Sequence, residues 1–401
     1  MNLNKIKRLL NFQLDIEDSQ SIFLFGPRGV GKTYLVMAFL EKYSKDLILS
    51  IDLLLEEQRI RYLKKPDQLV KEVDAFCINK KDQCIVFIDE IQKIPKMCDS
   101  VHHLIEKYYP KLIFILTGSS ARKLKREGAN LLAARATTHY LYPLSALEIS
   151  DVNFSLSMAL KIGTMPRPFL QLKRPIPYLS SYVKTYLKEE IRIEAKIRKI
   201  DEFNEFLILA AQNNAEPINY EKIAKEIGVS SPTIHEYYNI LEDTLIATKV
   251  NGWNHSIRKQ LIQQPRYYFF DCGIVNILNG LDVNNMNESG YYYGKLFETW
   301  MINEIVKINE YFQLGYSFYY WRTKSGAEID LILVKALKPL IAIEIKLKSI
   351  IEKEDIKELL AIKSEYPQIE SVVLSQTTQG YYLEHVFVTH WKVFLEKLQR
   401  V

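Results

Sequence analysis

The sequence has no long apolar run, no paired cysteines and no repeats, and each absence excludes a class of protein. No apolar stretch approaches the roughly 18 residues that a membrane-spanning helix needs. The basic segment Met1–Asp15 lacks the continuous apolar core of a signal peptide. The four cysteines form no Cys-x-x-Cys pair and have no nearby histidine spacing, which argues against a disulfide framework or a zinc site. We therefore expect a cytoplasmic protein with no membrane partner.

Composition and charge are those of an ordinary globular chain. Hydrophobic residues make up 48% and charged residues 25% of 401 residues, which is enough for two or three domains. The net charge of +5 arises entirely within residues 1–165, which hold 24 Lys and Arg against 19 Asp and Glu. The neutral remainder argues against a broad electrostatic footprint for nucleic acid there, although a local basic patch is not excluded.

A phosphate-binding loop is the strongest motif. Ser21–Phe25 reads as an apolar strand and a helical pattern begins at Thr33, so the segment between them has the strand-loop-helix context that a P-loop requires. Glycines allow backbone N–H groups to turn toward phosphate oxygens, the lysine neutralises the β- and γ-phosphates, and the threonine hydroxyl binds Mg²⁺. The predicted ATP-binding residues are Gly26, Pro27, Arg28, Gly29, Val30, Gly31, Lys32 and Thr33.

Two later strands end in polar residues that suit the same site. Gln83–Ile88 is followed by Asp89, predicted to hold Mg²⁺, and by Glu90, predicted to polarise the attacking water. A third strand, Lys111–Leu116, leads into Thr117-Gly118-Ser119-Ser120. Thr117 or Ser119 could sense the γ-phosphate, or the segment could be a turn and N-cap, and the sequence leaves this open.

Basic residues follow this third strand. For the cluster at 122–126 we favour a solvated surface. Arg135 stands alone in an apolar stretch and is a candidate catalytic contact to a phosphate, in cis or from a neighbouring subunit, with a surface salt bridge as the alternative. A contact from a neighbour would require a homo-oligomer.

These motifs together resemble a prokaryotic family of AAA-superfamily ATPases that carry a C-terminal region of unknown function. Besides the P-loop, the resemblance rests on Phe87–Gln92, Thr117–Ser120 and Leu141–Ser145 (Leu-Tyr-Pro-Leu-Ser). Two segments depart from the family pattern. Its Gly-Arg appears here as Ala134-Arg135, and its Gly-Gly-Tyr-Pro appears as Gly163–Pro166 (Gly-Thr-Met-Pro).

The middle of the chain has a winged-helix pattern. A helix over Ile218–Ile227, a turn at Gly228 and a second helix capped by Ser230 and continuing over Thr233–Leu241 form a helix-turn-helix. The strands of a wing then read as Leu245–Val250 and Arg266–Asp271. The second helix offers no Arg or Lys, so phosphate contacts would have to come from Arg258 and Lys259. DNA binding and protein docking are equally compatible with this pattern.

The C-terminal segment has the spacing of a PD-(D/E)XK nuclease. Asp330 lies in the predicted strand Ala327–Val334, and Glu344 and Lys346 share one face of the next, Leu340–Leu347. Two carboxylates would hold Mg²⁺ and the lysine would orient water, with Glu298 as a further metal ligand. The alternative is a solvated strand face. The family resemblance implies the same nuclease-like fold.

The sequence thus predicts an α/β protein of three domains: a P-loop AAA-type ATPase (1–165), a helical and winged-helix domain (166–289) and a PD-(D/E)XK nuclease-like domain (290–401). The favoured hypothesis is Mg²⁺-dependent ATP hydrolysis that controls the C-terminal module, with double-stranded or branched DNA as a candidate partner. The alternative is an ATP-dependent binding switch that docks a protein partner and carries an inactive nuclease-like domain.

Overall fold

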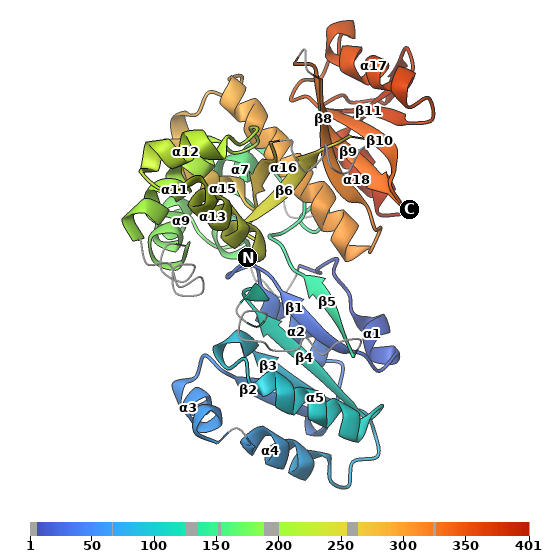
Figure 1. Cartoon of the computed structure of the whole chain (residues 1–401). Helices are drawn as coiled ribbons and strands as arrows, with labels where there is room; N and C mark the ends of the chain where they lie inside the picture. Colours follow the sequence, from blue (N-terminus) through green and yellow to red (C-terminus); the bar gives the residue numbers. More distant parts are fainter. Residues whose placement is uncertain are drawn as a thin grey trace.

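The computed structural model describes residues 6–65, 67–122, 124, 135–150, 154–187, 200–254, 264–323 and 326–400. A five-stranded sheet near the N-terminus and an eight-stranded sheet near the C-terminus are connected through a layer of helices (Figure 1). None of the helices in these ranges combines the length and apolar character that crossing a bilayer requires.

The N-terminal sheet is fully parallel, with strand order β2-β3-β4-β1-β5. Its strands are β1 (Ser21–Phe25), β2 (Ile48–Asp52), β3 (Cys84–Asp89), β4 (Leu112–Gly118) and β5 (Ala136–Tyr140). The three strands and the P-loop helix predicted in this region are confirmed within two or three residues at each end. Because all strands run the same way, the carboxyl ends of β1, β3 and β4 meet at one edge.

Both faces of this sheet are covered, which explains why its strands are almost continuously apolar. Alternate residues of β1 face opposite ways: Ile22 and Leu24 lie in one core, and Phe23 and Phe25 in the other. The first core also takes residues of α1 and α2, and the second takes residues of α3, α4 and α5. These helices are α1 (Gln13–Glu17), α2 (Lys32–Leu40), α3 (Glu56–Lys64), α4 (Gln68–Cys77) and α5 (Met97–Tyr108).

The middle segment is mainly helical, and its helix-turn-helix expectation is met locally. Gly228 ends α12 in the left-handed conformation, with φ +79°, and the Ser230 side chain accepts a hydrogen bond from the Thr233 N–H at the start of α13. Two antiparallel strands follow. The elements are α7 (Leu156–Ile162), α8 (Pro166–Leu170), α9 (Pro175–Ser181), the π-helix η4 (Tyr182–Leu187), α11 (Ile200–Gln212), α12 (Tyr220–Ile227), α13 (Ser231–Asp243), β6 (Ala247–Gly252), β7 (Arg266–Phe269) and α15 (Cys272–Leu278).

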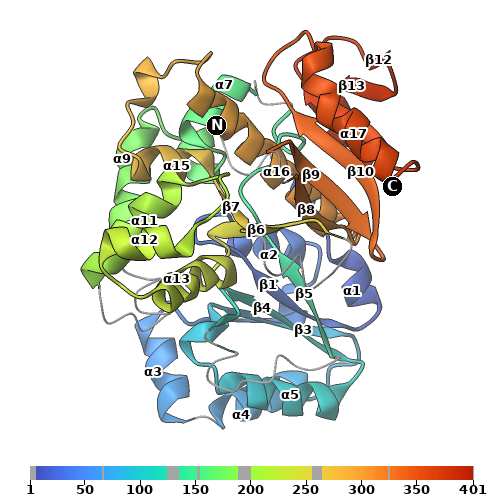
Figure 2. The ribbon, with the colours of Figure 1, turned by 45° about the horizontal axis from the view of Figure 1, so that its top comes forward.

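The C-terminal sheet is mixed and extends into the middle segment. Its order is β12-β13-β11-β10-β9-β8-β6-β7, because β6 pairs in parallel with β8 (Figure 2). The elements after α15 are α16 (Tyr291–Tyr311), β8 (Ser317–Arg322), β9 (Glu328–Lys335), β10 (Lys338–Ile345), α17 (Lys357–Glu365), β11 (Glu370–Ser375), β12 (Tyr381–Leu383), β13 (Val386–His390) and α18 (Trp391–Leu398). The two strands predicted around Asp330 and Glu344 are confirmed as β9 and β10, within two residues at each end.

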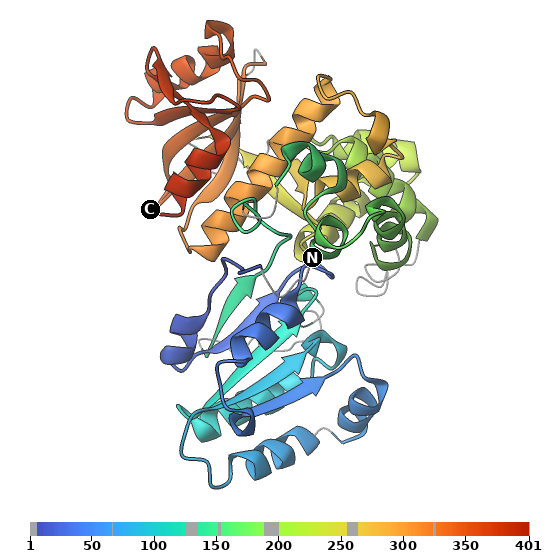
Figure 3. The same cartoon turned by 180° about the vertical axis from the view of Figure 1, so that it is seen from behind.

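Helix α16 is the longest of the described elements and lies between the helical layer and the C-terminal sheet (Figure 3). Its buried apolar residues from Tyr293 to Ile308 belong to one hydrophobic core that also contains Phe206 of α11, Ile274 of α15, Leu331 of β9 and Leu395 of α18, whereas Tyr311 at its end packs in the core of the N-terminal sheet. At about 1.5 Å per residue, 21 residues span roughly 31 Å. The middle and C-terminal segments therefore share a packed interior built around this helix.

One prediction for the basic cluster after β4 is wrong. Arg122 does not lie on a solvated surface: its side chain is 15% exposed and forms ion pairs with Glu236 and Asp243 of α13. Leu245, just after α13, also packs against the core of the N-terminal sheet. The segment after β4 is thus attached to the helix-turn-helix, while Lys123, Lys125 and Arg126 lie outside the described residues.

Candidate functional site

The P-loop connects β1 to α2 and wraps around the N-terminus of that helix. Gly29 and Gly31 have φ of +83° and +96°, a conformation that glycine adopts without a steric penalty. The Lys32 ammonium group is buried and donates hydrogen bonds to the Gly26 carbonyl at 2.8 Å and the Pro27 carbonyl at 3.2 Å. The loop is thereby closed over its own lysine, which lies where phosphate oxygens would approach the helix N-terminus.

Three of the predicted residues meet at the adjoining strand ends. The Thr33 hydroxyl donates a hydrogen bond to Asp89 Oδ2 at 2.7 Å, and the Thr117 hydroxyl donates to Asp89 Oδ1. Thr117 Oγ1 also accepts a hydrogen bond from the Glu90 N–H at 3.2 Å. A carboxylate and a hydroxyl side by side at the mouth of a phosphate loop are oxygen ligands of the kind that Mg²⁺ takes, so these residues fit the ion.

Glu90 has an unusual backbone beside this cluster. Its φ of +60° and ψ of +47° place it in the left-handed region, which costs a non-glycine residue about 1–3 kcal/mol. The side chain lines the same cavity as the P-loop. Gln92 donates hydrogen bonds to Glu90 and to Ser119 Oγ. The strained turn therefore places a carboxylate next to the loop, and Gln92, which also bonds to Ser119 after β4, holds it there.

The cavity over the P-loop, of about 340 Å³, is lined by residues that the sequence did not single out. Arg8 comes from the segment before α1, and Arg167 and Tyr178 come from the helices after the N-terminal sheet. The Arg167 guanidinium lies 5.3 Å from the centre of the Tyr178 ring. Arg167 directly follows the Gly163–Pro166 segment, so its position next to a family motif could have identified it from the sequence. Arg8 lies in no motif and could not have been identified in this way.

Gly163 has a packing role. Its φ is +73°, and a Cβ at this position would lie about 2 Å from the Asp271 carboxylate. That carboxylate accepts hydrogen bonds from the Thr164 N–H at 2.7 Å and from the Ile274 N–H at 3.3 Å, so it caps α15 and fixes the turn that leads into α8. Burial raises the pKa of Asp271 to about 6.

Arg135 is not a contact in cis. It immediately precedes β5, whose first residue pairs with Ser21 at the start of β1, so Arg135 lies at the opposite edge of the sheet from the P-loop. There it pairs with Glu106 at 2.6 Å. The prediction of a phosphate contact within one chain is wrong because parallel strands separate the two edges. A contact to a neighbouring subunit remains a prediction.

The second group of predicted residues forms an acidic cluster on the C-terminal sheet. Asp330 of β9 accepts a hydrogen bond from the Ile345 N–H at 2.8 Å, next to Glu344. Lys346 Nζ lies 2.6 Å from Glu344 Oε1. Burial, reinforced by the Asp330 charge, raises the pKa of Glu344 well above its usual value. Glu344 Oε2 is buried and has no hydrogen-bond partner, so it could accept a cation.

Glu298 of α16 faces the same cluster but is held by other side chains. It accepts a hydrogen bond from the Tyr268 hydroxyl at 2.9 Å and from Lys295 at 3.0 Å, and Arg266 lies 3.5 Å away. Burial, followed by the Asp330 charge, raises the pKa of Glu298. Across the described ranges, no three His, Cys, Asp or Glu side chains are grouped so that they could hold a metal ion. The structure therefore does not assemble Glu298, Asp330 and Glu344 into one metal site.

Of three further basic residues, only Arg322 can be placed. Arg322 pairs with Glu328 at 2.9 Å. Arg258 and Lys259 lie outside the described residues. Among the described residues, four carboxylates of the cluster thus face four cationic groups, namely Arg266, Lys295, Arg322 and Lys346 against Glu298, Glu328, Asp330 and Glu344.

The parallel five-stranded sheet and the loop geometry of the N-terminal region are consistent with a P-loop domain of the AAA type. Residues 18–150 match the family model of the AAA domain. Residues 153–285 and 293–394 match two models that are each described only as a domain of unknown function, DUF8612 and DUF4143.

The curated relatives are uncharacterized bacterial proteins. A protein of Haemophilus influenzae is 23% identical over 388 residues, which cover 91% of each chain. A protein of Mycobacterium tuberculosis, and one of Mycobacterium bovis, are 24% identical over 259 residues, or 64% of this chain. This chain spans 57% of the length of the mycobacterial proteins.

A similar solved structure is titled as Drosophila ORC bound to AT-rich DNA and Cdc6. The match has 10% sequence identity and a TM-score of 0.25, and it covers 66% of this chain and 87% of that chain.

Proposed function

We propose that the chain binds Mg²⁺-ATP at the P-loop and hydrolyses it. The backbone N–H groups of the loop and the Lys32 ammonium would bind the phosphates, Thr33 and Asp89 would hold Mg²⁺, and Glu90 would accept a proton from water. Bound Mg²⁺ supplies charge neutralisation at the phosphates. The observation that carries the proposal is the convergence of Thr33, Asp89 and Thr117 beside the loop.

The first test removes the P-loop lysine. Lys32→Ala should abolish ATP binding and turnover, because the buried Lys32 ammonium lies inside the loop where the β- and γ-phosphates would bind. A matched control is Arg59→Ala, an exposed basic residue on α3 outside the cavity. Calorimetric titration with Mg²⁺-ATP and a phosphate-release assay measure the two steps. Unchanged hydrolysis by Lys32→Ala would refute the site.

We also propose that the nucleotide state of the N-terminal region controls the remaining, C-terminal part of the chain. We assign 1–165 to the ATPase, 166–289 to a winged-helix unit and 290–401 to a PD-(D/E)XK-like unit that acts on DNA. Supporting observations are the helix-turn-helix around Gly228 and the neighbouring positions of Asp330, Glu344 and Lys346. DNA that stimulates ATP turnover would support this control, and turnover indifferent to double-stranded and branched DNA would argue for a protein partner.

An inactive nuclease-like unit is the second candidate, and the ion pairs of the acidic cluster favour it. Glu298, Glu328 and Glu344 each form an ion pair with a cationic side chain of the protein, which reduces the need for a metal ion there. The unpaired Glu344 Oε2 argues the other way. Mg²⁺-dependent cleavage of DNA that disappears in Asp330→Ala and persists in the exposed control Glu354→Ala would decide for catalysis. Equal inertness of all three proteins would decide for docking.

A further inference from the structure

Arg8 connects four parts of the molecule that are far apart in sequence. Its guanidinium donates hydrogen bonds to Glu148 Oε1 at 2.9 Å, the Val30 carbonyl at 2.8 Å, the Tyr142 carbonyl at 2.7 Å and the Tyr311 hydroxyl at 3.3 Å. The side chain is buried, and Glu148 is fully buried with it. A planar guanidinium can satisfy several acceptors in fixed directions, which an ammonium cannot do.

The contact with Val30 acts on the phosphate loop itself. The carbonyl of Val30 and the N–H of Gly31 belong to one planar trans peptide, so they point in opposite directions. A donor that fixes the carbonyl therefore also fixes the direction of the Gly31 N–H. Because Gly31 is left-handed and free to rotate, this peptide needs an external restraint to remain oriented for phosphate.

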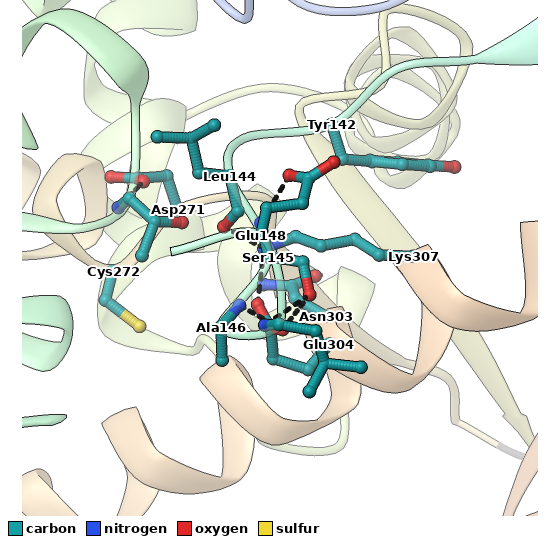
Figure 4. Close-up of polar contacts among 12 residues, drawn as sticks. Tyr142, Leu144, Ser145, Ala146, Glu148, Asp271, Cys272, Asn303, Glu304 and Lys307 are labelled. Atoms are coloured by element: carbon teal, nitrogen blue, oxygen red, sulfur yellow. Dashed lines mark hydrogen bonds and ion pairs between the residues drawn. The ribbon is translucent and has the colours of Figure 1, made fainter. Parts of the chain in front are cut away.

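The contact with Tyr311 leads away from the loop. Tyr311 is the last residue of α16, and its hydroxyl accepts hydrogen bonds from both Arg8 and the Tyr142 N–H. One turn earlier, Lys307 donates to the Leu144 carbonyl at 3.0 Å and pairs with Glu304 at 2.6 Å. Figure 4 shows Glu304 beside Ser145 and Ala146, which donate to its carboxylate at 2.7 and 2.8 Å.

Glu298 lies on the same helix, 13 residues before Tyr311, which corresponds to roughly 20 Å along the helix axis. Glu298 belongs to the acidic cluster with Asp330 and Glu344. A displacement at the C-terminal end of α16 would therefore reach the cluster through one continuous, buried helix.

We propose that Arg8 is a positioning residue of the nucleotide site, which orients the Val30–Gly31 peptide for phosphate and joins it through Tyr311 to α16. This inference rests on the proposed ATP function. Beyond that function, Arg8 becomes a residue of the nucleotide site that lies outside the recognised motifs, and it connects the loop to the C-terminal sheet. When phosphate occupies the loop, Arg8 keeps the Val30–Gly31 peptide in its binding orientation. Because Arg8 also bonds to Tyr311, bound nucleotide thereby orders α16.

The test uses the full chain and three variants. Arg8→Met removes the guanidinium, Arg8→Lys keeps the charge without the fork, and Tyr311→Phe keeps the ring but removes the hydroxyl. Arg59→Met on the exposed face of α3 is the control. The measurements are the dissociation constant and KM for ATP, thermal melting, and hydrogen exchange of residues 291–311 with and without the non-hydrolysable analogue AMP-PNP.

Arg8→Met should weaken ATP binding about 10- to 100-fold, which is the effect of losing a charge-assisted hydrogen bond in a buried site. Arg8→Lys should recover only part of this loss. Tyr311→Phe should bind ATP within about threefold of the wild type. It should lose the protection of α16 that AMP-PNP produces in the wild type, a change that a purely structural role of Tyr311 would not cause.

Wild-type ATP affinity in either Arg8 variant would overturn the positioning role. If Arg8→Met does not fold, Arg8→Lys decides alone. Equal AMP-PNP-dependent protection in Tyr311→Phe, or none in the wild type, would overturn the link to α16. The failure of the proposed function looks different, because then the wild type and Arg59→Met would bind no ATP either.

Discussion

At the residue scale, the site depends on side chains whose environments are not those of the isolated amino acid. Glu90 occupies a left-handed backbone conformation, and Lys32 is buried inside its own loop. Asp271 is a carboxylate that is only 3% exposed. Each arrangement costs free energy locally and persists only because surrounding contacts determine it. These residues should therefore respond to conservative substitutions more strongly than exposed neighbours do.

Asp271 should make stability depend on pH. Its folded pKa is about 6 against 3.8 for the unfolded chain, so between these values the native state binds more protons than the unfolded state. Protonated Asp271 therefore contributes to the free energy of unfolding in full below about pH 4. This contribution, roughly 3 kcal/mol, is lost as the pH rises to about 6. Asp271→Asn should lose this slope, and thermal melting of both proteins at pH 4.5 and 7.5 measures it. Parallel pH profiles would contradict the assignment.

Gly163→Ala should destabilise the protein by about 2 kcal/mol or more, because φ is positive there and the new methyl group would collide with the Asp271 carboxylate. The matched control is Gly294→Ala in α16, where no atom lies within 4 Å of the added Cβ. That change should be neutral or stabilising by about 0.5–1 kcal/mol. Chemical denaturation of the two variants gives the comparison, and equal stabilities would be inconsistent with the packing at Gly163.

At the element scale, α16 is attached to the N-terminal region by a buried ion pair rather than by apolar packing alone. Glu304 and Lys307 are 0% and 2% exposed, and both also bond to the 144–146 segment. Removal of one partner leaves an uncompensated buried charge, whereas removal of both does not. The pair therefore gives a direct means of weakening this attachment.

Lys307→Met should destabilise the protein by roughly 3–5 kcal/mol, and the double variant Glu304→Gln/Lys307→Met should recover part of that loss. A double-mutant cycle in urea measures the coupling between the two positions. Strictly additive effects would show that the two side chains do not act as a pair.

A second attachment joins the segment after β4 to α13. Arg122→Ala should cost only about 0.5–1 kcal/mol, since Glu236 and Asp243 are partly exposed, but it should increase hydrogen exchange in residues 231–243. The exposed Arg59→Ala serves as the control. Unchanged exchange in α13 would mean that the apolar contact of Leu245 suffices to hold this helix.

At the scale of the whole molecule, local patterns predicted the elements but not their contacts. Strands β1, β3 and β4 and the P-loop helix could be read from short apolar runs and one motif, because each depends on neighbouring residues. The parallel pairing of β6 with β8 joins residues 251 and 319, and no local signal encodes it.

The same reason explains the residues that were missed or misplaced. Arg8 reaches partners 22 to 303 residues away, so its role becomes visible only in three dimensions. Arg122 and Arg135 were judged from their neighbours in sequence, whereas α13 and the opposite edge of the sheet determine their environment. Glu298 was predicted to be a further metal ligand, but the cations from β7 and α16 that surround it were not foreseen, and among the described residues it forms no metal-binding group with Asp330 and Glu344.

The central claim is that this P-loop site hydrolyses ATP with Glu90 as the group that activates water, and Glu90→Gln tests it most directly. The amide keeps the shape of the side chain and cannot accept the proton, so ATP should bind with nearly wild-type affinity. Its turnover should fall by about 100-fold or more. Steady-state phosphate release and ATP titration on the same preparation give both values. Turnover at the wild-type rate, or loss of binding together with turnover, would contradict the account.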